Sequence, residues 1–124
     1  MTHRVLPDDR RVGRRVLRLR PAGLWHGRTI GACWDDTCAA RGDAIAFIDG
    51  EEEITFAEMH DRTRRLAAAI EAGPEIRHGE GVVSLLPNWW EAAAVFLATA
   101  MAGATAIPIV PILGEREIAH ILRT

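Results

Sequence analysis

The chain has 124 residues, of which 48% are hydrophobic and 26% are charged, and its formal net charge is −2. This length and composition are ordinary for one soluble globular domain. The longest apolar stretch, residues 92–102, is far too short to span a bilayer, and no apolar run follows the first arginines as a signal peptide requires. These features exclude a transmembrane segment and favour a cytoplasmic protein.

The charge is unevenly distributed along the chain. Residues 1–28 carry eight arginines and two aspartates, whereas residues 29–124 carry seven arginines and fifteen acidic residues. We interpret residues 1–28 as a basic N-terminal arm that lies along the acidic surface of a larger body. Binding of nucleic acid or membrane is the alternative, but no aromatic residue precedes Trp25, so we expect no nucleic-acid partner.

The cysteines and histidines form no recognisable metal or redox motif. Cys33 and Cys38 are the only cysteines, and their spacing matches neither a zinc ligand pair nor a redox CxxC pair. The five histidines are scattered along the chain. We therefore expect two free thiols and no metal site.

The first predicted elements after the arm are a helix and a hairpin. A helix is expected from Thr29, which serves as its cap, to about Arg41. The alternating residues 44–48, the turn signal at residues 49–50 and the return strand at residues 52–55 predict an antiparallel hairpin.

A second helix is predicted from Thr55 to about Ala72. Thr55 and Glu58 have the spacing of a capping box, in which each satisfies a backbone N–H at the start of the helix. The positions expected to be buried are Met59, Thr63, Leu66 and Ile70. The ion pairs expected on the exposed side are Glu58–Arg62 and Asp61–Arg65.

The last part of the chain predicts a strand, a helix, a strand and the start of a further helix. Residues 82–86 form a near-continuous apolar strand, and Asn88 is expected to cap a helix at residues 89–102. That helix is apolar nearly all round and is therefore expected to be buried. Residues 104–110 form the next strand, and residues 115–122 the further helix. Short links between these elements predict a right-handed βαβ unit with a parallel sheet.

Several phrases, in this order, resemble the AMP-forming acyl-CoA synthetases of the adenylate-forming ligase family. They are Ala44-Ile-Ala-Phe with Ile54-Thr-Phe-Ala-Glu-Met, Gly79-Glu-Gly-Val-Val-Ser-Leu-Leu-Pro-Asn88, Ala102-Gly-Ala with Ile107-Pro-Ile-Val-Pro111, and Arg116-Glu-Ile-Ala-His-Ile-Leu. The resemblance spans roughly residues 29–123. Leu86-Pro-Asn-Trp-Trp-Glu91 and the segment from Val110 to Ile118 look most similar to short-chain fatty-acyl and alicyclic carboxylate–CoA ligases.

The resemblance implies a fold and a reaction. The fold is α/β, with residues 29–124 forming a partial N-terminal subdomain of a layered large domain that contains a parallel βαβ unit and an antiparallel hairpin. In the family's reaction a carboxylate attacks the α-phosphate of ATP, and a thiol then displaces AMP. ATP, magnesium and CoA are thus implied for the full-length parent, with a carboxylic acid as substrate and the remainder of the ligase as partner.

The residues that carry this chemistry in the family have no counterpart in this chain. It has no lysine and no Ser/Thr/Gly-rich phosphate loop, and Ile112 stands where the family commonly has an arginine. We therefore assign no catalytic, cofactor-binding or metal-binding residue, and we expect no cofactor to bind this chain alone.

Trp89 and Trp90 are the only residues assigned to a substrate pocket. They start a helix at the carboxyl end of a parallel strand, where α/β folds bind ligands, although core packing is the alternative. Ser84 is expected to be a buried hydroxyl bonded to backbone, and His120 an exposed residue rather than a base. The carboxylates expected to be solvated rather than cation-binding are Asp35, Asp36 and Glu51–Glu53.

Two functional hypotheses follow. The first is a fragment of an ATP-dependent carboxylate–CoA ligase of fatty-acid metabolism, inactive by itself. The second is a standalone, non-catalytic interaction module derived from that family. For the fragment we expect exposed apolar surface that promotes self-association, whereas a sharp monomer with protected strands would favour the interaction module.

Overall fold

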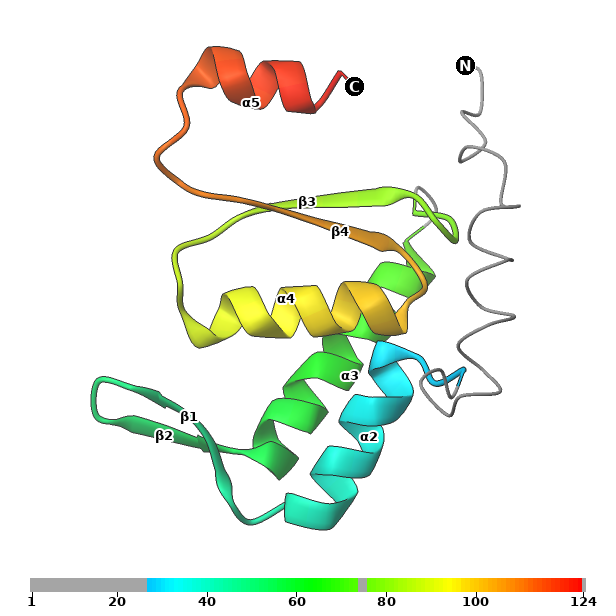
Figure 1. Cartoon of the computed structure of the whole chain (residues 1–124), viewed down its shortest axis with the longest axis vertical. Coiled ribbons are helices and arrows are strands. Elements are labelled where there is room, and N and C mark those ends of the chain that lie inside the picture. The colour runs from blue at the N-terminus through cyan, green and yellow to red at the C-terminus, as the bar shows by residue number, and fades with distance from the viewer. Residues whose placement is uncertain (1–26, 74–75, 124) are drawn as a thin grey trace, which may run out of the picture.

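The structure is a computed structural model that describes residues 27–73 and 76–123 (Figure 1). The predicted basic arm at residues 1–28 lies almost wholly outside this part of the chain. None of the helices in the described ranges is both long enough and apolar enough to cross a membrane.

Helix α2 (Ile30–Arg41) and the hairpin follow the sequence prediction closely. The hydroxyl of Thr29 caps α2 by accepting a hydrogen bond from the Ala32 N–H at 3.1 Å. Strands β1 (Ile45–Asp49) and β2 (Glu52–Thr55) pair antiparallel. The turn between them includes Gly50 at a φ of 62°, a left-handed conformation that glycine adopts without strain.

Helix α3 (Phe56–Ala72) begins with the predicted capping box, since Thr55 and Glu58 exchange both hydrogen bonds. The predicted ion pair of Asp61 with Arg65 is present at 2.7 Å. The other predicted pair is wrong, because the Glu58 carboxylate bonds to Thr55 while the guanidinium of Arg62 reaches Glu52 at 3.2 Å.

The βαβ unit consists of β3 (Gly81–Leu85), α4 (Trp90–Met101) and β4 (Thr105–Ile109), and its two strands pair in parallel. The predicted cap at Asn88 is wrong. The helix begins one residue later, with Trp89 at the cap position and no side-chain cap bond. Asn88 instead lies in a tight turn closed by the Trp89 N–H and the Pro87 carbonyl at 2.8 Å, and it is exposed.

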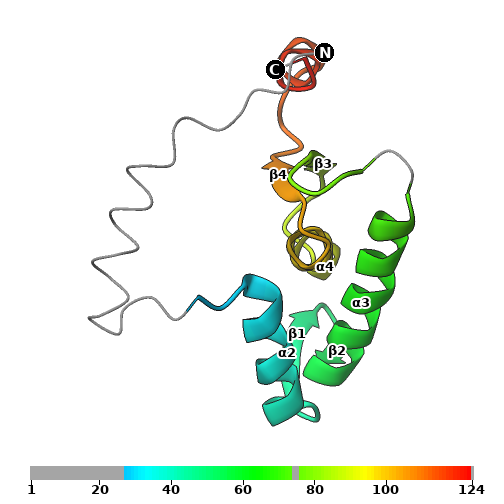
Figure 2. The ribbon, with the colours of Figure 1, turned by 90° about the vertical axis from the view of Figure 1, so that its right-hand side faces the viewer.

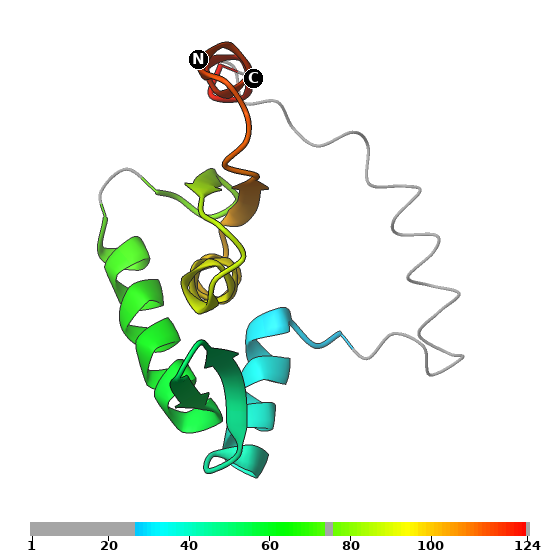
Figure 3. The same ribbon diagram turned by 90° about the vertical axis from the view of Figure 1, so that its left-hand side faces the viewer.

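The elements form layers around α4. The β3–β4 sheet lies on one side of α4 and the α2–α3 pair on the other, as views from two opposite sides show (Figures 2 and 3). Ile54, Met59 and Ala94 form the core cluster. The partly buried residues packed against it are Trp34, Phe47, Trp90, Ala93 and Leu97.

The prediction that α4 is buried all round is only partly correct. Ala94, Ala98 and Thr99 are buried, but the Phe96 side chain is 43% exposed. The described layers cover two sides of α4, so part of its apolar surface stays open. Helix α5 (Glu115–Ile121) stands apart and makes no extensive contact with another described element.

Candidate functional site

A cavity of about 420 Å³ lies where the tip of the β1–β2 hairpin meets the start of α4. Its walls come from two segments far apart in the chain. The lining residues are Phe47, Ile48, Asp49, Asn88, Trp89, Trp90 and Ala93. Both tryptophans that the sequence singled out therefore contribute to one concave surface.

The two tryptophans have different environments. Trp90 packs against the core cluster, and the guanidinium carbon of Arg62 lies 4.4 Å from the centre of its ring. Such a cation–π contact, together with the ion pair from Arg62 to Glu52, fixes the Trp90 ring. Trp89 is 55% exposed. Trp90 is thus largely a packing residue, whereas Trp89 is free to contact a ligand or another protein surface.

The chemistry of this cavity suits an apolar or aromatic group. Three aromatic rings and Ile48 supply hydrophobic surface, and Asp49 and Asn88 supply the polar atoms at the rim. No cationic side chain lines it. A nucleoside triphosphate with magnesium therefore does not fit these residues, which agrees with the absence of lysine from the chain.

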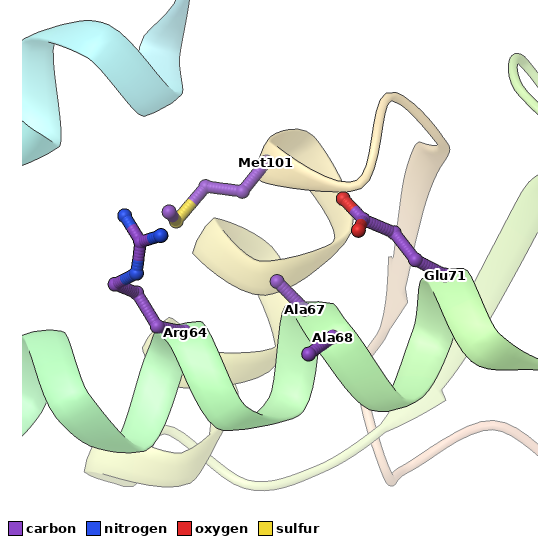
Figure 4. A pocket seen from close by; sticks show the side chains of 5 residues that line it. All are labelled: Arg64, Ala67, Ala68, Glu71 and Met101. Atoms are coloured by element: carbon purple, nitrogen blue, oxygen red, sulfur yellow. The ribbon is translucent and has the colours of Figure 1, made fainter.

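A second, smaller hollow of about 240 Å³ lies between α3 and the end of α4. Figure 4 shows Arg64 and Glu71 of α3 flanking it and Met101 of α4 facing them. Ala67 and Ala68 complete the lining. Among the described residues no tryptophan contributes to this hollow, and its opposite charges lie on a single helix.

Of the acidic residues considered for cation binding, Asp35, Asp36 and Glu52 contact basic side chains. Asp35 contacts the Nε2 of His60 at 2.7 Å and lies 3.8 Å from Arg64, and Asp36 pairs with Arg28. No cluster of His, Cys, Asp or Glu able to hold a metal ion occurs in the part of the chain that the structure describes. The contacts of Asp35 link α2 to α3, whereas the pair of Asp36 with Arg28 joins α2 to the residues that precede it.

Cys33 and Cys38 are both free, as predicted. Cys38 is buried, and burial, with a smaller contribution from Asp35, raises the pKa of its thiol. Cys33 is exposed. Neither thiol lies beside the cavity at the start of α4, so neither is placed to react there.

Two further expectations can be compared with the structure. Ser84 is half-buried in β3, and its hydroxyl forms no hydrogen bond to a described residue, so the expected backbone bond is wrong. A single sequence does not show whether a strand lies at the centre or at the edge of its sheet. The partners of the Ser84 hydroxyl could therefore not be predicted from the sequence. His120 lies exposed in α5, as expected.

The residues that sequence reasoning missed are those of the hairpin tip. Phe47, Ile48 and Asp49 face the tryptophans, yet they precede them by about forty positions in the chain. The one signal available in the sequence was Ile48, an apolar residue beside a turn. In the structure the Ile48 side chain is 69% exposed.

Residues 34–124 match the family of AMP-binding enzymes. This match covers well over half of the chain, so the chain belongs to that family. The resemblance inferred from the sequence phrases is thereby confirmed.

Two relatives illustrate the similarity. A salicylyl-CoA synthase/salicylate adenylyltransferase from a Streptomyces species is 30% identical over 105 residues, which cover 84% of this chain and 19% of that protein. Triostin synthetase I from Streptomyces triostinicus is 36% identical over 104 residues, covering 82% of this chain and 19% of that protein. The chain spans about a fifth of the length of these relatives.

Solved structures agree with the fold. The N-terminal subdomain of Klebsiella oxytoca NpsA superposes with a TM-score of 0.72 at 23% identity, covering 77% of this chain and 25% of that chain. A Mycobacterium tuberculosis fatty acyl CoA synthetase gives a TM-score of 0.70 at 28% identity, covering 76% and 19%. The predicted α/β class, with its hairpin and parallel pair, is confirmed as that of an N-terminal adenylation subdomain.

Proposed function

We propose that this chain is the N-terminal part of an ATP-dependent, AMP-forming carboxylate–CoA ligase and that it is inactive by itself. The observation that carries the proposal is the family match over residues 34–124, combined with a fold that corresponds to a fifth to a quarter of its relatives. On this view residues 29–124 are one partial subdomain, preceded by the basic arm.

The chain contributes a scaffold to this reaction. Activation of a carboxylate by ATP needs donors for the phosphate oxygens and a cation near the developing charge. This chain has no lysine, and the cavity at the start of α4 has no cationic wall. The groups that handle ATP, magnesium and CoA therefore belong to the rest of the ligase.

The substrate we propose is a carboxylic acid with a hydrocarbon or aromatic body. The relatives include both the salicylyl-CoA synthase and a medium-chain fatty-acid–CoA ligase of Escherichia coli, the latter 27% identical. A role in fatty-acid metabolism in the cytoplasm fits the second of these. Trp89 and the hairpin tip would then border the route of the acid, since their cavity accepts an apolar group.

Acid-dependent exchange of pyrophosphate into ATP tests the proposal. The protein is produced from the same gene together with the coding sequence that follows residue 124, and a panel of aromatic, alicyclic and fatty acids is offered. Exchange that depends on one class of acid supports the ligase. A protein that is folded and binds none of these acids would favour the interaction module instead.

A further inference from the structure

The tip of the β1–β2 hairpin carries negative charge that the described residues balance only in part. Asp49, Glu51, Glu52 and Glu53 are all exposed. Asp49 lies directly opposite Glu52 in the antiparallel ladder, and like charges in that position destabilise a hairpin. Glu52 pairs with Arg62 at 3.2 Å, whereas the other three carboxylates form no ion pair with a residue of the described ranges.

The contacts of Arg62 show which kind of group this surface accepts. Its guanidinium carbon lies 4.4 Å from the centre of the Trp90 ring, and its Nη2 reaches the Glu52 carboxylate. A guanidinium suits both contacts, because the planar cation stacks on an aromatic face and its N–H groups pair with carboxylate oxygens. One arginine thus joins the hairpin to the start of α4.

The same combination of groups occurs a second time without a cation. Trp89 and Asp49 line one cavity, the Trp89 side chain is 55% exposed, and no cationic side chain contributes to that cavity. A second guanidinium there would stack on Trp89 and reduce the repulsion between Asp49 and Glu52. It would lie at the rim, so the interior of the cavity would stay open to an apolar group.

The N-terminal arm of the chain has the complementary charge. Residues 10–20 contain six arginines and no acidic residue, whereas residues 29–124 carry fifteen acidic residues against seven arginines. The chain has no lysine, so every basic side chain of the arm is a guanidinium able to make both contacts seen at Arg62.

The distance between the arm and the cavity is short. The start of α2 lies beside the end of α4, since a Cβ added to Gly31 would lie 3.1 Å from the Cγ of Met101. The cavity is at the opposite end of α4 (Figure 1). A helix of the length of α4 spans about 18 Å, and the residues between 20 and 27 would span about 20 Å if extended. Arginines of residues 10–20 can therefore reach the cavity.

We propose that the hairpin-tip surface, formed by Asp49, Glu51, Glu53 and Trp89, binds arginine side chains from residues 10–20 of the same chain. One guanidinium stacks on Trp89 and pairs with Asp49, and others pair with Glu51 and Glu53. The arm then frames the rim of the cavity. This docking requires no ligase activity and applies equally to the interaction module.

Amide hydrogen exchange of the 124-residue chain at low ionic strength tests the docking. The variant with four arm arginines neutralised carries Arg14→Gln, Arg15→Gln, Arg18→Gln and Arg20→Gln. Its amides at residues 49–53 and at Trp89 should exchange at least about threefold faster than those of the native chain, while the amides of α3 do not change. Addition of 1 M salt should have the same effect on the native chain, because salt screens exposed charges.

A control variant and a charge exchange make the test specific. Arg116→Gln with Arg123→Gln removes arginines outside the arm and should leave the exchange of the hairpin tip unchanged. Glu51→Arg with Glu53→Arg should remove the protection. Replacing the same four arm arginines by glutamate in that variant should restore the protection, which a purely structural role of the hairpin carboxylates would not do. Circular dichroism checks that all variants keep the native helical content.

Three results would overturn the proposal. The first is a hairpin tip that exchanges equally fast with and without the arm arginines, and the second is a charge exchange that restores nothing. The third is protection that disappears on dilution, because the arginines would then come from a second copy. Pyrophosphate exchange by the longer protein is a separate measurement, so failure of the proposed ligase function leaves the docking intact and failure of the docking leaves the ligase function intact.

Discussion

At the scale of single residues, Thr55 and Asn88 both precede helices, but only Thr55 caps one. We predict that Thr55→Ala lowers the free energy of unfolding by about 1 kcal/mol, because the N–H of Glu58 loses its acceptor. Asn88→Ala is the matched control and should leave the stability unchanged, since no cap bond is made there. Denaturant unfolding measures both; a larger loss for Asn88→Ala would contradict the structure.

The carboxylate of Glu58 predicts a dependence of stability on pH. The N–H of Thr55 donates to it, and this bond, followed by that from the Thr55 hydroxyl and by the charge of Arg62, lowers the pKa of Glu58. A lowered pKa means that the ionised form is favoured by folding. Its contribution is present above the ordinary glutamate pKa of about 4.3 and is lost as the pH falls through the folded value.

Glu58→Gln should therefore remove part of the acid sensitivity. The melting temperatures of the native protein and the variant are compared between neutral and strongly acidic pH. We expect their difference to be largest at neutral pH and to shrink as the carboxylate of Glu58 becomes protonated. A difference that stays constant over this range would show that Glu58 makes no ionic contribution.

At the scale of the elements, the sequence predicted every described helix and strand in the right order. Patterns with a period of two or 3.6 residues, and caps such as Thr29 and Thr55, act over short distances and can be read locally. The boundaries moved by a residue or so where a turn competed, as at Asn88. The exposure of Phe96 could not be predicted, because it depends on which layers surround α4.

The core between the hairpin, α3 and α4 provides an element-scale prediction. Met59 is fully buried between Ile54 of β2 and Ala94 of α4. Met59→Ala should lower the free energy of unfolding by about 2–5 kcal/mol, through lost burial and the cavity left behind. Ile112→Ala is the control, because that side chain is 86% exposed. Comparable losses in the two variants would place the core elsewhere.

The candidate site shows why a tertiary cavity is harder to predict than its parts. The position of Trp89 and Trp90 at the carboxyl end of β3 could be read from the pattern of strand and helix. Their contact with Phe47 depends on how the hairpin packs against α4, and no local pattern determines that. Arg62 was expected to pair along its own helix, yet the neighbouring Trp90 and Glu52 attract it.

At the scale of the whole molecule, several large apolar side chains of the described residues are exposed. The most exposed large ones in the second half of the chain are Leu85, Trp89, Phe96, Val110, Ile112 and Leu122. Together with the free edge of β3, they favour association between copies. We predict that the purified chain binds hydrophobic dyes and forms oligomers by light scattering. A sharp monomer with strongly protected amides in both β3 and β4 would contradict this expectation.

The most direct measurement of the central claim is pyrophosphate release by the isolated 124-residue chain. The chain is incubated with ATP, magnesium and a panel of carboxylic acids, beside a full-length fatty-acid–CoA ligase as positive control. The account predicts no release above the buffer blank, because the chain has no lysine and its aromatic cavity has no cationic wall. Acid-dependent release that tracks the purified chain would contradict the claim that adenylation needs the rest of the ligase.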